Sequence, residues 1–153
     1  MKQSAGILLY KYIHKELFVF LVHPGGPLWK NKDLESWSIP KGEFIPPEEA
    51  LNAALREFEE ETGQTITAKK FMELKPVKLK SGKTVYAWAC AQDIDAASVK
   101  SNTFSLEWPP KSGRFNDYPE IDRAAWFSVE EALRKINPAQ QHFIIELQDL
   151  LNN

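Results

Sequence analysis

The sequence lacks paired cysteines, a long apolar run and an excess of charge of either sign. Its one cysteine, Cys90, cannot form an internal disulfide, which excludes a small disulfide-stapled fold and is typical of a reducing compartment. The longest apolar run near the start, residues 17–22, is far shorter than the roughly 20 residues of a membrane-spanning helix. The first residues run straight into strand-like sequence with no signal-peptide pattern. These absences predict a cytoplasmic protein without a membrane partner.

The near balance of charge excludes a further class of protein. The chain has 19 basic and 21 acidic side chains and a formal net charge of −2, so it has no overall field that would attract a nucleic-acid polymer. Its 153 residues, 43% hydrophobic and 26% charged, match one globular domain spanning residues 1–153. We therefore expect a single-domain protein, a monomer or a homodimer, that binds no nucleic-acid polymer.

Short β-branched and aromatic runs alternate with turn residues along most of the chain. Prolines and acids favour the first turn of a helix, and glycine is the usual residue just beyond its last turn. A long irregular loop is uncommon unless it serves a function. The pattern predicts strands at 5–10, 17–23, 71–80, 83–91 and 124–127; helices at 46–62, capped by Gly63, at 129–136, with Ser128 as N-cap, and from Pro138 onward; and irregular loops at 23–36 and 105–119.

The acidic residues are unevenly distributed. Seven of the 21 acids lie between Glu43 and Glu61, and Arg56 is the only basic residue in that segment. On a helix, Glu57, Glu60 and Glu61 fall within an arc of about 100°, so three carboxylates share one face and repel one another. A divalent cation such as Mg²⁺ removes this conflict, because it prefers carboxylate oxygens and shares its other positions with water and phosphate. The alternative is an ordinary solvated acidic helix face.

The spacing of these residues favours the functional interpretation. Residues 42–64 resemble the Nudix box, which reads G, five residues, E, seven residues, then R-E-x-x-E-E-x-G. Two positions that usually hold a bulky aliphatic residue differ, since Phe58 and Gln64 stand there. The lead-in at 37–42 and the segment 125–132 also resemble the family. The matching fixed residues are Gly42, Glu48, Arg56, Glu57, Glu60, Glu61 and Gly63.

The resemblance implies a fold and an activity. Nudix proteins share an α/β/α sandwich with a mixed β-sheet, which places the chain in the α/β class. They hydrolyse a nucleoside diphosphate linked to another moiety with Mg²⁺, for which Mn²⁺ can substitute. The resemblance therefore implies a Mg²⁺-dependent pyrophosphohydrolase of a small nucleotide substrate. Metal-activated water needs no covalent nucleophile, so we expect Cys90 to be a buried apolar residue.

The same resemblance implies roles for individual residues. Glu57 is a candidate base for the attacking water as well as a metal ligand. Some Nudix enzymes use a further acid outside the box, and Glu120 stands where such an acid would come; the alternative is a solvated loop carboxylate. The residues implied are Lys41 (by its main-chain carbonyl), Glu57, Glu60 and Glu61 for metal binding; Arg56, Glu57, Glu60 and Glu120 for catalysis; and Gly42 and Glu48 for orienting the carboxylates.

Substrate choice must come from loops, because the same fold serves many substrates. In the loop 105–119, Lys111 and Arg114 could bind extra phosphates and Tyr118 could stack on a base, with Trp108 and Phe115 beside it. The alternative is a proline-stiffened surface loop. The chain is most similar to Nudix proteins that act on nucleoside triphosphates, with asymmetric cleavage of diadenosine polyphosphates as the second hypothesis. A non-catalytic nucleotide sensor is the third, and the intact acidic set argues against it.

Overall fold

The computed structural model describes residues 2–152, and within that range a six-stranded sheet forms the centre of the fold. Its order is β4-β5-β1-β2-β8, with β3 beside β1. β1 and β5 run parallel and the other pairs antiparallel, so the sheet is mixed, as predicted. The bounds are β1 Gln3–Ile13, β2 Glu16–Pro24, β3 Lys41–Phe44, α1 Ala50–Thr62, β4 Met72–Lys78, β5 Thr84–Ala91, β6 Thr103–Glu107, β7 Phe115–Pro119, β8 Ile121–Ser128, α2 Val129–Lys135 and α3 Gln141–Leu151.

Strand β1 pairs with different strands along its length. Its residues 3–6 pair with β3, its residues 10–13 pair with β2, and β5 follows it along most of its length. Ile7, Leu8 and Leu9 are fully buried, because a strand covered on both faces reads as a continuous apolar run. Strand β3, which leads into α1, therefore lies against the first half of β1.

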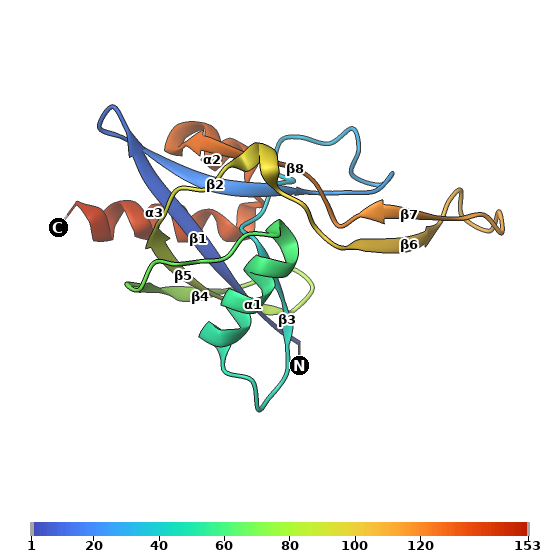
Figure 1. Cartoon of the computed structure of the whole chain (residues 1–153), viewed down its shortest axis with the longest axis horizontal. Coiled ribbons are helices and arrows are strands. Elements are labelled where there is room, and N and C mark those ends of the chain that lie inside the picture. The colour runs from blue at the N-terminus through green and yellow to red at the C-terminus, as the bar shows by residue number, and fades with distance from the viewer. Residues whose placement is uncertain (1, 153) are drawn as a thin grey trace.

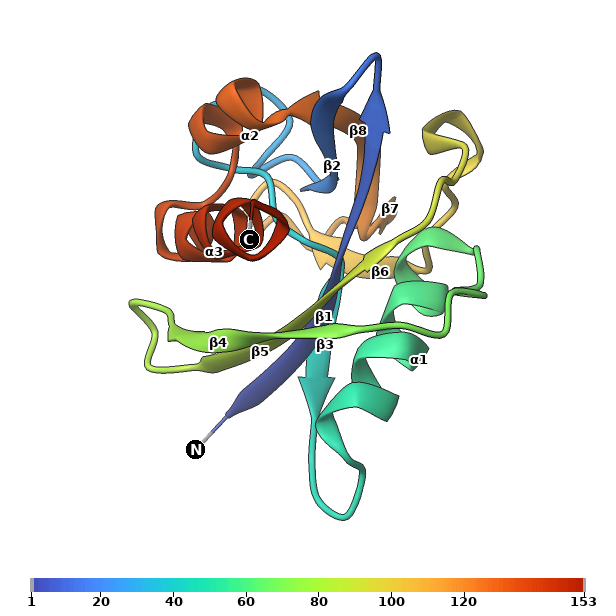
Figure 2. The same cartoon turned by 90° about the vertical axis from the view of Figure 1, so that its left-hand side faces the viewer.

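Helices cover both faces of the sheet, with α1 on one side and α2 and α3 on the other (Figure 2). On the α1 side, Phe58 of the helix packs in one buried cluster with Ile7 and Leu9 of β1. On the opposite side, Leu8 packs with Phe143 and other apolar residues of α3. Successive strand residues thus point to opposite faces. The predicted α/β/α sandwich is confirmed.

Helix α1 begins later than predicted and ends where predicted. It starts at Ala50, not at residue 46, because the chain turns first, with the Glu48 N–H donating to the Ile45 carbonyl at 3.1 Å. At the other end Gly63 has a φ of 73° and its N–H donates to the Glu59 carbonyl. A side chain is disfavoured in this left-handed conformation, so glycine closes the helix.

The predicted irregular loop at 105–119 is wrong. Strands β6 and β7 pair antiparallel over residues 103–107 and 115–119, and the proline- and glycine-rich residues 108–114 form only the connection between them. Sequence reasoning extended the turn signal of the connection over strands that are short and largely polar. Figure 1 shows this hairpin, which we call the arm (residues 103–119), extending away from the sheet and helices.

The C-terminal elements follow the prediction with one change. Ser128 caps α2, because its side chain accepts a hydrogen bond from the Glu131 N–H. Pro138 begins a short 3₁₀ turn, and α3 starts only at Gln141; proline fits a first turn and disfavours helix at the residue before it. Within residues 2–152, no helix is both long and apolar enough to cross a membrane.

Candidate active site

Arg56 joins the acidic side chains of α1 to the turn before the helix. Its guanidinium donates two parallel hydrogen bonds to Glu48, at 2.8 and 2.9 Å, a bidentate geometry that fixes both groups. The remaining nitrogen, Nη1, lies 2.8 Å from Glu57 and 3.2 Å from Glu60. These bonds lower the pKa of Glu48 and raise that of Arg56. Arg56 therefore holds three carboxylates on one side of the helix.

Glu57 lies directly against the backbone of Gly42 in β3. A Cβ at Gly42 would lie 1.8 Å from Glu57 Oε2 and 2.6 Å from Oε1, so only glycine leaves room for this carboxylate. Burial raises the pKa of Glu57, Arg56 opposes this through its hydrogen bond, and the charge of Glu60 adds to the rise. Glu57 is therefore a partly desolvated carboxylate, and the charge of Arg56 compensates its negative charge only in part.

Glu61 connects α1 to the same strand. Its Oε1 accepts a hydrogen bond from the Lys41 N–H at 3.1 Å. Burial raises the pKa of Glu61 to about 8, and the negative charges of Glu57 and Glu120 contribute to the rise. Burial also lowers the pKa of Lys41. A bound cation would compensate the charge that this buried carboxylate acquires on ionisation.

A cavity of about 240 Å³ opens beside these residues. Lys41 and Glu61 line one part of it, and Glu120 and Trp29 line other parts. Glu120 belongs to the turn between β7 and β8, so the cavity joins the acidic helix to a carboxylate about sixty residues away in the chain. The other lining residues are Val22, Pro24, Ser36, Trp37, Ser38, Ile39, Leu79, Ile121, Asn137 and Gln140.

The backbone of Glu120 is held on both sides. Its N–H donates to the Asn102 carbonyl at 2.8 Å, and its carbonyl accepts from the Gly25 N–H at 2.9 Å. A Cβ at Gly25 would lie 2.0 Å from the Pro119 carbonyl oxygen. Gly25 is therefore required for the close approach of the loop 25–36 to the turn that carries Glu120.

Replacing Gly25 with alanine should displace Glu120, because the new methyl meets backbone and not a flexible side chain. We expect a loss of turnover of roughly tenfold or more, since small misplacement of a catalytic group is costly. Steady-state kinetics measures this. In a Glu120→Gln background the alanine should cost much less, and an equal loss in both backgrounds would contradict a role through Glu120.

The structure brings together most of the residues singled out in the sequence. A chain of contacts along α1, the turn before it and the start of β3 joins Lys41, Gly42, Glu48, Arg56, Glu57, Glu60 and Glu61, and Glu120 lies near Glu61. Lys111, Arg114 and Tyr118 lie on the arm, and none of them lines the cavity. Tyr118 packs its ring against Phe104 of the same arm. Contact of the arm with substrate therefore stays a prediction.

The carboxylates do not converge on one point in this structure. Among residues 2–152, no three His, Cys, Asp or Glu side chains are close enough to hold a metal ion as they stand. Glu57 and Glu60 turn toward Arg56, and Glu61 turns toward the backbone of Lys41. The residues nevertheless fit a hard divalent cation, because all the available donors are oxygens and the single guanidinium of Arg56 is shared among Glu48, Glu57 and Glu60.

Sequence reasoning missed Gln140 as a residue of the site. Its buried amide Oε1 accepts from the Ile39 N–H at 3.1 Å, and its Nε2 donates to Ser38 Oγ at 3.0 Å. Gln140 thus fixes the segment that leads into Lys41. Gln140 lies in the short 3₁₀ turn before α3, next to the polar Gln141 and His142, so the sequence does not distinguish it. Nothing in the spacing identifies its partners, which lie 101 and 102 residues away.

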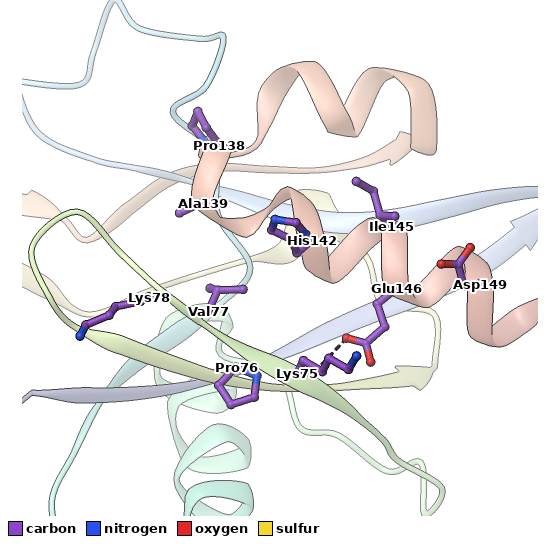
Figure 3. Close-up of a pocket in the computed structure, with 10 residues that line it drawn as sticks. All are labelled: Lys75, Pro76, Val77, Lys78, Pro138, Ala139, His142, Ile145, Glu146 and Asp149. Carbon is purple, nitrogen blue, oxygen red and sulfur yellow. Dashed lines mark hydrogen bonds between the residues drawn. The ribbon is translucent and has the colours of Figure 1, made fainter.

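A second, larger groove of about 610 Å³ lies between β4 and α3 (Figure 3). Lys75 and Lys78 lie on the strand side, and Glu146 and Asp149 on the helix side. Glu146 accepts a hydrogen bond from the Lys75 N–H at 2.8 Å. None of the box residues lines this groove. It therefore does not share the chemistry of the acidic cavity.

Comparison with known protein families identifies the family of this chain. A family model described as the NUDIX domain matches residues 2–147. The chain belongs to the Nudix family. This Nudix protein is therefore a hydrolase that acts on pyrophosphate bonds, as its sequence predicted.

Solved structures with the same fold come from several organisms. A C. elegans Ap4A hydrolase in a binary complex is 20% identical, with a TM-score of 0.70 over 99% of this chain and 98% of that one. The NUDIX domain of Shewanella oneidensis NrtR, complexed with ADP ribose, is 16% identical, with a TM-score of 0.65 over 97% and 87%. The E. coli ORF135 protein is 18% identical, with a TM-score of 0.62 over 99% and 91%. At these identities the likeness concerns the fold alone.

Proposed function

We propose that this Nudix hydrolase cleaves a nucleoside triphosphate or a similar nucleoside diphosphate-linked compound with water, in a reaction that depends on Mg²⁺. The observation that carries the proposal is the placement of Glu57 against Gly42 and of Glu61 against the Lys41 N–H, with Glu60 joined to Glu57 through Arg56, next to a cavity. A solvated helix face needs neither a glycine that leaves room for a glutamate nor partly buried carboxylates. Mn²⁺ has the same preference for oxygen ligands and should substitute.

Each residue of the group has a part in this proposal. Glu57, Glu60 and Glu61, with the main-chain carbonyl of Lys41, would hold the cation. When bound, Mg²⁺ supplies neutralisation of the diphosphate charge and a lowered pKa of bound water. Arg56 orients the carboxylates through its hydrogen bonds to Glu57 and Glu60, and Glu48 anchors Arg56.

The proton of the attacking water needs a base, and two carboxylates are available. Glu57 is held by Arg56 and Gly42, whereas Glu120 lies across the cavity near Glu61. We favour Glu120, because a carboxylate that binds the cation is less basic than one that does not.

Replacing Glu120 with glutamine should lower kcat at least roughly tenfold, because a positioned base contributes about 10²–10⁴-fold to rate. The affinity for Mg²⁺, measured by titration calorimetry, should change little. A large loss of Mg²⁺ affinity would instead make Glu120 a metal-binding residue, and unchanged kinetics would exclude it from the reaction.

The proposal is tested by a panel of nucleotides screened for phosphate release with Mg²⁺, with Mn²⁺ and with chelator. The matched variants are Glu60→Gln, which removes a carboxylate of the group, and Glu59→Gln, which changes a neighbouring exposed glutamate outside it. We expect metal-dependent turnover that Glu60→Gln abolishes and Glu59→Gln preserves. Binding of nucleotides without turnover of any diphosphate would support a sensor and overturn the proposal.

Asymmetric cleavage of diadenosine polyphosphates is a second candidate. It is favoured by Trp29 at the cavity, with the Lys32 ammonium 5.0 Å from its ring centroid, because an indole can stack on a second base and a cation can meet extra phosphates. One structural neighbour is an Ap4A hydrolase. Turnover in ¹⁸O-labelled water separates the candidates, since the products and the labelled phosphorus identify the bond that is cut. On the arm, Lys111, Arg114 and Tyr118 are proposed to contact the longer substrate.

A further inference from the structure

We propose that this chain forms a homodimer in which the outer edge of β6 pairs antiparallel with the same edge of a second copy, joining the two arms into a four-stranded sheet. The observations are the isolation of the arm, the free hydrogen-bonding groups of one of its edges, and the self-complementary sequence of that edge.

The arm is poorly supported by its own molecule. It is a two-stranded sheet that projects from the body (Figure 1), and an isolated hairpin is at best marginally stable in water. It approaches the body near its base, where Phe104 lies against Gly26 and the Pro119 carbonyl against Gly25. Further strands would stabilise such a hairpin by pairing its edges.

The hydrogen-bond pattern shows which groups of β6 are free. The Trp108 N–H donates to the Arg114 carbonyl, and the Glu120 N–H donates to the Asn102 carbonyl. Because backbone groups alternate in direction along a strand, the even-numbered residues of β6 face β7. Thr103, Ser105 and Glu107 therefore point their N–H and C=O groups outward, and within residues 2–152 those groups have no hydrogen-bond partner.

The sequence of β6 complements itself when two copies pair antiparallel with Ser105 opposite Ser105. Phe104 of one copy then lies opposite Leu106 of the other, on one face, and Thr103 lies opposite Glu107 on the other face. No like charges meet, and about six hydrogen bonds would join the strands. The pairing is symmetric, as a twofold dimer requires.

Two other strand edges, those of β7 and β4, are less suited to such pairing. On the outer edge of β7, symmetric pairing would place Asp117 opposite Asp117, and Pro119 has no N–H to donate. On β4, Pro76 and a bulge interrupt the edge. The Lys75 N–H of this strand already donates a hydrogen bond to Glu146 (Figure 3). Thr103 to Glu107 contain no proline, lysine or bulge. The edge of β6 is therefore better suited to a second copy than the edges of β7 and β4.

The first experiment measures molar mass by sedimentation velocity or light scattering. We expect the wild type to be a dimer and Ser105→Pro to be a monomer, because proline removes an outward N–H of β6 without touching the bonds to β7. The matched control is Asp117→Pro, which makes the same change on the outer edge of β7 and should remain a dimer. A monomeric wild type, or a dimer that Ser105→Pro leaves intact, would overturn the proposal.

A second experiment stays informative if proline unfolds the arm. In the proposed register the two Ser105 Cα atoms lie about 5.5 Å apart, within the range of roughly 4.4–6.8 Å that a disulfide spans. Ser105→Cys should therefore give a covalent dimer under a mild oxidant, and Asp117→Cys should not. The native Cys90 is buried and burial raises its pKa to about 12, so it does not compete. Equal cross-linking of both variants, or of neither, would contradict the register.

Discussion

Replacing Gly42 with alanine should lower kcat by roughly 10²-fold and leave the folded protein about as stable as the wild type. The added Cβ would lie 1.8 Å from Glu57 Oε2, so the carboxylate must move. Because the atom displaced is the end of a flexible side chain, the backbone of β3 and α1 can stay in place. The expected loss is in kcat, because misplacement of a catalytic group by about 1 Å can reduce the rate 10²-fold. Steady-state kinetics and thermal melting measure the two effects.

A second substitution shows whether Gly42 acts through Glu57. Glu57→Asp withdraws the carboxylate by roughly one carbon–carbon bond, about 1.5 Å, and should itself reduce kcat. In that background the methyl of Gly42→Ala has less to displace, so the two losses should be strongly non-additive. Glu59→Asp, on an exposed position of the same helix, is the control in which Gly42→Ala keeps its full effect. Additive losses with Glu57→Asp would mean that Gly42 acts elsewhere.

The parts of this fold that sequence reasoning predicted correctly are those governed by local chemistry. The alternation of Val85, Ala87 and Ala89 predicts β5, Gly63 ends α1 in the conformation that favours glycine, and Ser128 caps α2. In each case the deciding interaction lies within a few residues. The Nudix box is equally local, since one helix and its preceding turn carry nearly all of it.

The parts that were missed depend on contacts between distant residues. The amide of Gln140 bonds to Ile39, and the ring of His23 bonds to Asp122 across 99 residues. Gly25 is needed because the Pro119 carbonyl approaches it. No spacing rule connects such pairs, so sequence alone identified Glu120 only by its position before the last strand. The arm was missed for a different reason, because its prolines gave a stronger signal than its short strands.

The stability of the metal-free protein should fall as pH rises from about 5 to 8, and Mg²⁺ should reverse the fall. Burial raises the pKa of Glu61 from an ordinary value of 4.5 to about 8. Between these values the folded state holds a proton that the unfolded chain has released, so the free energy of unfolding decreases with increasing pH. A shift of this size corresponds to roughly 5 kcal/mol, which the partial exposure of the side chain reduces to roughly 2–4 kcal/mol.

Thermal melting at a series of pH values, with chelator and with Mg²⁺, measures this effect. For a chain of this size, 1 kcal/mol moves Tm by about 2–4 °C. Glu61→Gln should flatten the pH dependence, because the neutral amide keeps the hydrogen bond from Lys41 and cannot ionise. Mg²⁺ at about 100 times its Kd adds about 2.7 kcal/mol to the free energy of unfolding. At a fixed Mg²⁺ concentration the stabilisation should be larger at high pH than at low pH, because the cation binds the ionised carboxylate. A wild type whose Tm with chelator rises from pH 5 to 8 would show that Glu61 ionises freely in the fold, and the buried carboxylate would then have no need of a cation.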